Sequence, residues 1–123
     1  MIEYGILLGS IAACVAADLY DITKTVAGIK KGVGVEGSAV INFFTRTNKP
    51  SFLQLLVVNM FVPIVPMALP GLILSHNVAV EAFSIVGMLI GVYTHVHGGL
   101  DWKALIGGAN PNTIDTQWWE KIL

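Results

Sequence analysis

Residues 52–74 read FLQLLVVNMFVPIVPMALPGLIL, a stretch without a single charged side chain. A helix that crosses the hydrocarbon core of a membrane needs about 20 mostly apolar residues. This stretch is therefore long and apolar enough to predict one transmembrane helix, and it decides the class of protein to which the rest of the chain must conform.

The composition of the whole chain agrees with this interpretation. Of its 123 residues, 54% are hydrophobic and only 12% are charged, and the mean hydropathy is +0.72. Soluble domains carry about 25% charged residues. The formal net charge of −1 offers no basic surface for nucleic acid, and the single cysteine, Cys14, excludes a disulfide framework. We expect an integral membrane protein whose first partner is the lipid bilayer.

Two further apolar stretches, at about residues 4–29 and 78–97, flank the first. They predict an all-α, polytopic membrane domain of three transmembrane helices over residues 1–99. Residues 100–123 are polar and rich in turn formers, which predicts an interfacial or cytoplasmic tail. Residues 34–45, between the first two spans, are expected to form a short interfacial or re-entrant helix.

The second span contains three prolines on one helical face, and the residues before it carry a helix-start signal. Ser51 can cap the helix, or Pro50 can occupy its first turn. Proline removes a backbone donor and bends a helix. We therefore expect a proline-kinked or broken second half, with an outright turn at Pro70–Gly71 as one alternative; the three residues are Pro63, Pro66 and Pro70.

The basic residues predict an orientation. Four of them, Lys30, Lys31, Arg46 and Lys49, lie between the first and second spans, and none lies between the second and third. Cytoplasmic loops carry an excess of Lys and Arg. The N-terminus is therefore expected outside and the C-terminus inside, in a prokaryotic cell membrane or a viral membrane.

Small and acidic residues within the spans mark candidate contacts between helices. Asp18 and Asp21 are three residues apart and share a face of the first span, either in water at the membrane boundary or in a buried polar cluster that contacts another helix. Gly87 and Gly91 are four residues apart in the third span, a spacing that allows another helix to approach closely.

Two histidines near the end of the third span are candidate metal ligands. On a continuous helix His95 and His97 point about 200° apart and cannot hold one ion. If the helix unwinds at Gly98–Gly99, both can face one side, and Asp101 can complete a site for copper, zinc or iron. The alternative is a pair of histidines that only make hydrogen bonds at the membrane interface.

The spacing Asp21, Thr25, Gly32, Glu36 resembles the opening of a family of small bacterial and archaeal three-span membrane proteins, a domain of unknown function. Its members read D-xxx-T, then a glycine, then E-x-N-P. In this chain Gly37, Ser38 and Ala39 follow Glu36, so the Asn-Pro pair is missing. The resemblance implies a three-span fold and no particular activity.

No nucleophile elbow, phosphate-binding loop or H-E-x-x-H motif occurs in the sequence. We therefore expect a chain that is not an enzyme by itself. The leading hypothesis is a non-catalytic accessory or structural subunit, packed against other membrane subunits or against copies of itself in a respiratory or oxygenase-type complex or a viral membrane. The alternatives are a metal-binding or redox subunit that uses the His/Asp cluster, and an ion conduit through Asp18, Asp21 and Glu81.

Overall fold

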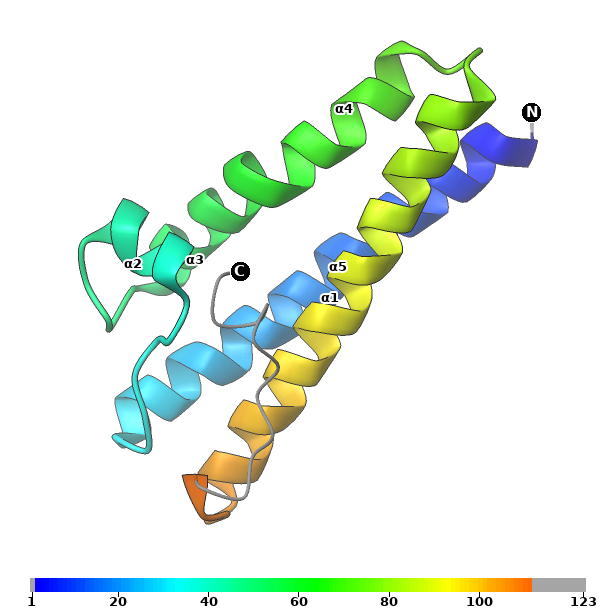
Figure 1. Ribbon diagram of the computed structural model, residues 1–123. Helices are drawn as coiled ribbons and strands as arrows, with labels where there is room; N and C mark the ends of the chain where they lie inside the picture. Colours follow the sequence, from blue (N-terminus) through cyan, green and yellow to red (C-terminus); the bar gives the residue numbers. More distant parts are fainter. Residues whose placement is uncertain (1, 112–123) are drawn as a thin grey trace.

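The computed structural model describes residues 2–111 and is all-helical over them. Three helical segments are long and apolar enough to cross a membrane: Tyr4–Lys31, Phe52–Ile73 and Val78–Ile106. The predicted all-α fold with three spans is confirmed at this level. In chain order the elements are α1 (Ile2–Lys31), α2 (Ala39–Thr45), α3 (Phe52–Asn59), the π-helix η1 (Met60–Ile64), α4 (Val65–Ile73) and α5 (Val78–Ile106) (Figure 1).

The two long helices, α1 and α5, lie side by side and run in the same direction (Figure 1). Their contact residues alternate at spacings of three and four, the pattern of a coiled-coil seam. Because both helices keep this spacing, residues about 77 apart in the sequence meet along the seam. On α1 the seam includes Cys14, Asp18, Asp21 and Gly28, and on α5 it includes Gly91, His95, Gly98 and Trp102.

Helix α5 continues through Gly98–Gly99 and ends only at Ile106. The helix therefore extends beyond residue 97, where the third span was expected to end, and residues 100–106 belong to it. The physical reason is the neighbouring helix: Gly99 lies against the Tyr20 ring with no room for a Cβ, and a Cβ on Gly98 would lie only 3.0 Å from the Asp21 Oδ1. The glycines thus allow close packing, and do not interrupt the helix. Residues 112–123 of the predicted tail lie outside the described residues.

The second span is one helical rod built from α3, η1 and α4. Ser51 is its N-cap and forms a capping box with Gln54, which confirms the first of the two predicted helix starts. Pro63 lies inside the π-helix, where the wider turn accommodates a residue that cannot donate to the preceding turn. Pro70 and Gly71 both lie within α4, so the alternative of a turn at this point was wrong.

Helix α2 lies in the connection between the first two spans, as expected for the short helix predicted there. Ser38 caps its N-terminus, and Arg46 ends it in the left-handed conformation at φ 54°. Its Phe43 and Phe44 rings are exposed and meet edge to face at 5.2 Å. An exposed aromatic pair beside a basic residue is suited to the membrane–water interface.

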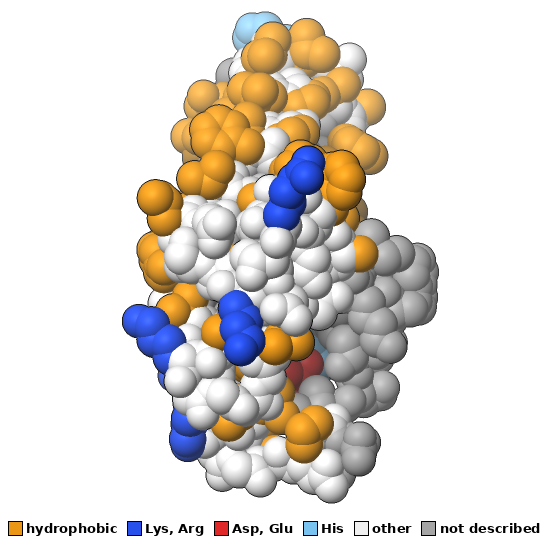
Figure 2. All heavy atoms as spheres, turned by 90° about the vertical axis from the view of Figure 1, so that its left-hand side faces the viewer, with side chains coloured by type: hydrophobic (Ala, Val, Ile, Leu, Met, Phe, Trp, Pro, Cys, Tyr) orange, Lys and Arg blue, Asp and Glu red, His pale blue; other side chains and the backbone are white. Residues whose placement is uncertain are grey.

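The basic residues gather toward one end of the molecule. Lys30 and Lys31 end α1, Lys103 lies in the last turn of α5, and the Lys31 Nζ donates to the Ile106 carbonyl at 2.6 Å. In Figure 2 the Lys and Arg side chains lie on the middle and lower part of the surface, whereas the upper part is mostly hydrophobic.

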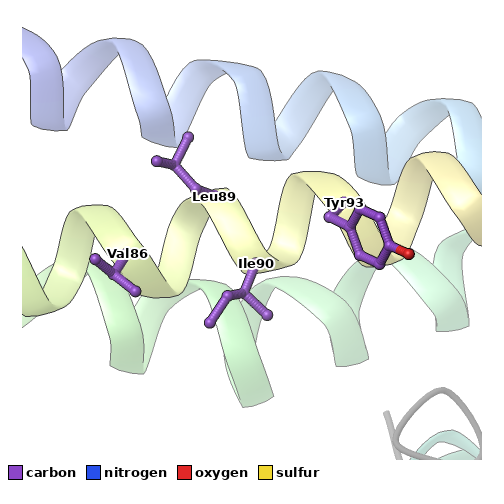
Figure 3. A pocket seen from close by; sticks show the side chains of 4 residues that line it. All are labelled: Val86, Leu89, Ile90 and Tyr93. Atoms are coloured by element: carbon purple, nitrogen blue, oxygen red, sulfur yellow. The ribbon is translucent and has the colours of Figure 1, made fainter. Parts of the chain in front are cut away.

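Outside the helix contacts, the surface of the spans is apolar. One face of α5 shows this clearly: Val86, Leu89, Ile90 and Tyr93 are each more than half exposed and line a shallow recess (Figure 3). In a membrane such a face contacts either lipid chains or another helix.

Candidate functional site: a buried polar cluster beside a cavity

Asp18 is the most deeply buried charged side chain among the described residues, with 0% of its surface exposed. The Asn59 Nδ2 of α3 donates a hydrogen bond of 2.6 Å to its Oδ1. Its other oxygen, Oδ2, has no hydrogen-bond partner within residues 2–111. Of the two alternatives for Asp18, the structure thus supports the buried polar cluster: this carboxylate meets two other helices and does not lie at a wet boundary.

His95 of α5 lies between the two carboxylates of α1. Its Nδ1 is 3.0 Å from the Asp21 Oδ2 and 3.6 Å from the Asp18 Oδ1. The Thr25 Oγ1, one turn further along α1, is 3.3 Å from the Asp21 Oδ1. The Asp21 side chain is 22% exposed, so the cluster is accessible from outside at Asp21 and fully buried at Asp18. A histidine between two carboxylates can hold a proton and thereby neutralise part of their charge.

One member of this cluster, Asn59, is not among the residues predicted from the sequence. The second span contains two amide side chains, those of Gln54 and Asn59. Gln54 belongs to the capping box, so Asn59 is the one without a local role. A polar side chain at membrane depth normally has a partner on another helix. That rule, applied to Asn59, would have predicted a polar partner for it on α1 or α5.

The three candidate metal ligands are not brought together. His95 faces Asp21 on α1, whereas His97 pairs with Asp101 on its own helix at 3.4 Å and stacks on Tyr93. Because α5 stays helical at Gly98–Gly99, the unwinding on which a shared site depended does not occur. Within the described part of the chain, no three His, Cys, Asp or Glu side chains are grouped closely enough to hold a metal ion.

Gly87 and Gly91 both lie where another helix approaches closely, but they face different helices of the same chain. A Cβ on Gly91 would lie 2.7 Å from the Cys14 Sγ on α1, and a Cβ on Gly87 would lie 2.5 Å from Met67 on α4. The pair therefore brings α1 and α4 onto α5, one helix at each glycine.

A cavity of about 650 Å³ lies beside the polar cluster. Its walls come from α1, the residues before and within α2, the middle of the second span (residues 58–67) and α5. The polar lining residues include Asp21, Thr25, Glu36, Asn59, His95 and Asp101. Ligand cavities in proteins have volumes of about 300–1,000 Å³ and combine apolar walls with a few convergent polar groups. The cavity therefore has the size and lining of a small-molecule site.

Glu36 brings a third carboxylate to this cavity from outside the spans. Its backbone N–H donates to the Asn48 carbonyl at 2.8 Å, and its Oε1 accepts from the Ser38 N–H at 2.8 Å. Burial raises the pKa of the Glu36 carboxyl above its ordinary value of 4.5, and the negative charge of Asp21 raises this pKa further. Both carboxyl groups line the same cavity.

The chain matches no protein-family model, no curated protein and no solved structure. The resemblance to the three-span family therefore depends on Asp21, Thr25, Gly32 and Glu36 alone. The structure places three of these four at the cavity, namely Asp21, Thr25 and Glu36.

Proposed function

We propose that this chain is a non-catalytic, membrane-embedded subunit that packs against other membrane subunits, or against copies of itself, within a larger assembly. A respiratory or oxygenase-type complex and a viral membrane are the settings in which we expect it. In this proposal the basic end faces the cytoplasm, the prolines of the second span bend it, and the polar tail lies at the inner membrane surface.

The observation that carries the proposal is the recess on the outer face of α5. Helices in membranes associate by fitting side chains of one helix into grooves of the other. The recess is lined by Val86, Leu89, Ile90 and Tyr93, all from α5. Each of these side chains is 53–56% exposed within residues 2–111. A neighbouring helix that places one side chain in this recess would bury them.

The alternative of a metal-binding or redox subunit has less support. It needs His95 and His97 to share a ligand set, and they face different partners. The ion-conduit alternative needs a polar connection from the Asp18 cluster to Glu81, and Glu81 lies in the first turn of α5, toward the other end of the bundle. We therefore keep the subunit proposal as the single candidate function.

The test is to extract the full chain from its own membrane in polymer nanodiscs and to weigh the intact particles by mass spectrometry. We expect further protein chains, or further copies of this chain, in fixed ratio. Leu89→Trp enlarges a side chain in the recess and should lower the recovery of those chains. Ile73→Trp is the matched control, because Ile73 is 72% exposed on the second span and lies outside the recess.

A particle that contains one copy of the chain and only lipid would overturn the proposal. Equal recovery of the associated chains with Leu89→Trp and Ile73→Trp would remove the α5 recess as the contact. Because tryptophan is tolerated against lipid, a folding defect shared by both variants would be visible as a loss of monomer in both.

A further inference from the structure

The cavity beside the polar cluster is elongated. Along α1 its wall runs from Cys14 to Thr25, which at the rise of an α-helix corresponds to about 16 Å. Toward the basic end its lining includes Thr25, Glu36 and Asp101, and toward the other end it includes Cys14, Met67 and Phe83. The cavity is therefore polar at one end and apolar at the other.

The polar end is rich in carboxyl groups among its described residues. Three carboxylates line the cavity, those of Asp21, Glu36 and Asp101, and the only basic side chain among the described lining residues is the imidazole of His95. Directly behind Asp21 lies Asp18, which is fully buried and has one oxygen without a hydrogen-bond partner in residues 2–111. Among the described lining residues, carboxyl groups therefore outnumber basic side chains.

A ligand for this end must therefore carry positive charge, and its shape is constrained by the lining. A metal ion needs several ligand atoms converging at about 2.0–2.6 Å, and the described residues hold no such group. An ammonium group instead donates three hydrogen bonds in spread directions, which suits acceptors on separate elements. Asp21 on α1 and Glu36 in the connection before α2 are such acceptors.

The remainder of the cavity suits an apolar body attached to that ammonium. Trp102 also lines the cavity, and an aromatic side chain can attract a cation. Beyond it the second span and α5 supply aliphatic walls, among them Val62, Ile64 and Met88. Apolar walls of this kind bind hydrocarbon by removing it from water.

We propose that this cavity binds a primary amine with an apolar body, its ammonium held between Asp21 and Glu36 and its apolar part lying along Val62 and Met88. The ammonium could belong to a free amine or to the ethanolamine headgroup of a lipid. In either case the cavity would recognise the same chemical group, an ammonium attached to an apolar body. This proposal does not depend on the subunit function, because the described lining residues of the cavity all belong to this chain.

The test uses Trp102 as the reporter. In a full chain that carries Trp118→Phe and Trp119→Phe, Trp102 is the one remaining tryptophan. This protein, in nanodiscs of phosphatidylcholine, is titrated with 2-phenylethylamine at neutral pH, and the fluorescence is recorded. The matched neutral probe is 2-phenylethanol, which has nearly the same shape without the charge. We expect a saturable change with the amine and none with the alcohol.

Glu36→Gln and Asp21→Asn should each weaken amine binding about tenfold, the loss expected when a hydrogen bond to a charged group is removed. Lys103→Gln is the control, because Lys103 is exposed and does not line the cavity. Nanodiscs that contain phosphatidylethanolamine distinguish the two sources of ammonium. A lipid source predicts that this lipid alone changes the Trp102 signal and competes with the amine, whereas a free amine predicts an unchanged titration.

A linear response to the amine, or equal responses to the amine and the alcohol, would overturn the proposal. These two outcomes concern the protein with its cavity residues intact, so they decide the matter even if Asp21→Asn does not fold. If both carboxylate variants fold and bind the amine as tightly as Lys103→Gln does, the assignment of the ammonium to Asp21 and Glu36 is wrong.

Discussion

The Nδ1 of His95 lies 3.0 Å from the Oδ2 of Asp21, although 74 residues separate them in the sequence. This contact fixes the register of α5 against α1, since it stands at one position of a seam that continues to Gly91–Cys14 on one side and to Trp102–Gly28 on the other. The same contact positions Asp21 at the wall of the cavity. The packing of the two long helices therefore also determines the geometry of the candidate site.

The close contact of Gly28 with Trp102 predicts a stability loss on adding one methyl group. A Cβ at Gly28 would overlap the Trp102 ring, so Gly28→Ala should destabilise the fold by about 1–3 kcal/mol. Gly9→Ala is the matched control: nothing lies within 4 Å of a Cβ at Gly9, and alanine favours the helix. The free energy of unfolding of both variants is measured in mixed micelles. Trp102→Leu should restore part of the loss in Gly28→Ala, and equal stability of the two single variants would contradict the close packing.

The hydrogen bond from Asn59 to Asp18 predicts that the two side chains are energetically coupled. Asn59→Ala removes the donor to a carboxylate that is fully buried and should cost about 1 kcal/mol or more. A double-mutant cycle with Asp18→Ala measures the coupling by the same unfolding assay. Asn48→Ala is the control, because Asn48 is exposed. Additive effects of Asn59→Ala and Asp18→Ala would mean that the bond contributes nothing.

The capping box at the start of the second span predicts a smaller, local effect. Ser51→Ala removes the acceptor of the Gln54 N–H and should cost about 1 kcal/mol. Ser51→Thr keeps a hydroxyl at the same position and should retain most of the stability. The measurement is the midpoint of unfolding for the three proteins, and a Ser51→Ala protein as stable as the original would argue against this helix start.

Burial of Glu36 predicts a pH dependence of stability. Because burial raises the pKa of this carboxyl in the folded protein, the folded state favours its neutral form. The stabilising contribution is therefore full below the ordinary value of 4.5 and is lost as the pH rises through the higher folded-state pKa. Glutamine stays neutral at every pH. Glu36→Gln should therefore weaken the dependence of the unfolding midpoint on pH above 4.5. Curves of equal slope for Glu36→Gln and the original protein would exclude Glu36 as the cause.

The orientation predicted from the basic residues is tested by labelling intact cells with a thiol reagent that does not cross membranes. In a Cys14→Ser background, which has no other cysteine, His76→Cys should react from outside and Lys49→Cys should react only after the membrane is opened. His76 and Lys49 are both exposed, so burial does not protect either position. Labelling of Lys49→Cys in intact cells would invert the topology.

Much of the fold could be predicted because its determinants are local. The second span was recognised from its lack of charge, and Ser51 from a capping signal within four residues. The C-terminal end of α5 could not be predicted in this way, because the pair Gly98–Gly99 is compatible with two structures. In an isolated helix two glycines favour a break, whereas here they form a contact surface against Tyr20 and Asp21. Which structure forms depends on residues far away in the sequence.

The sequence by itself determined that this protein has three apolar helices, with its basic residues at one end, since the length and composition of a segment are enough to match it to the hydrocarbon core of a membrane. Only the tertiary structure decided that His95 meets Asp21, that Asn59 meets Asp18, and that a cavity lies beside them. The physical reason is that the register between two helices depends on how their side chains fit along the whole contact, and a single stretch of sequence does not contain that fit.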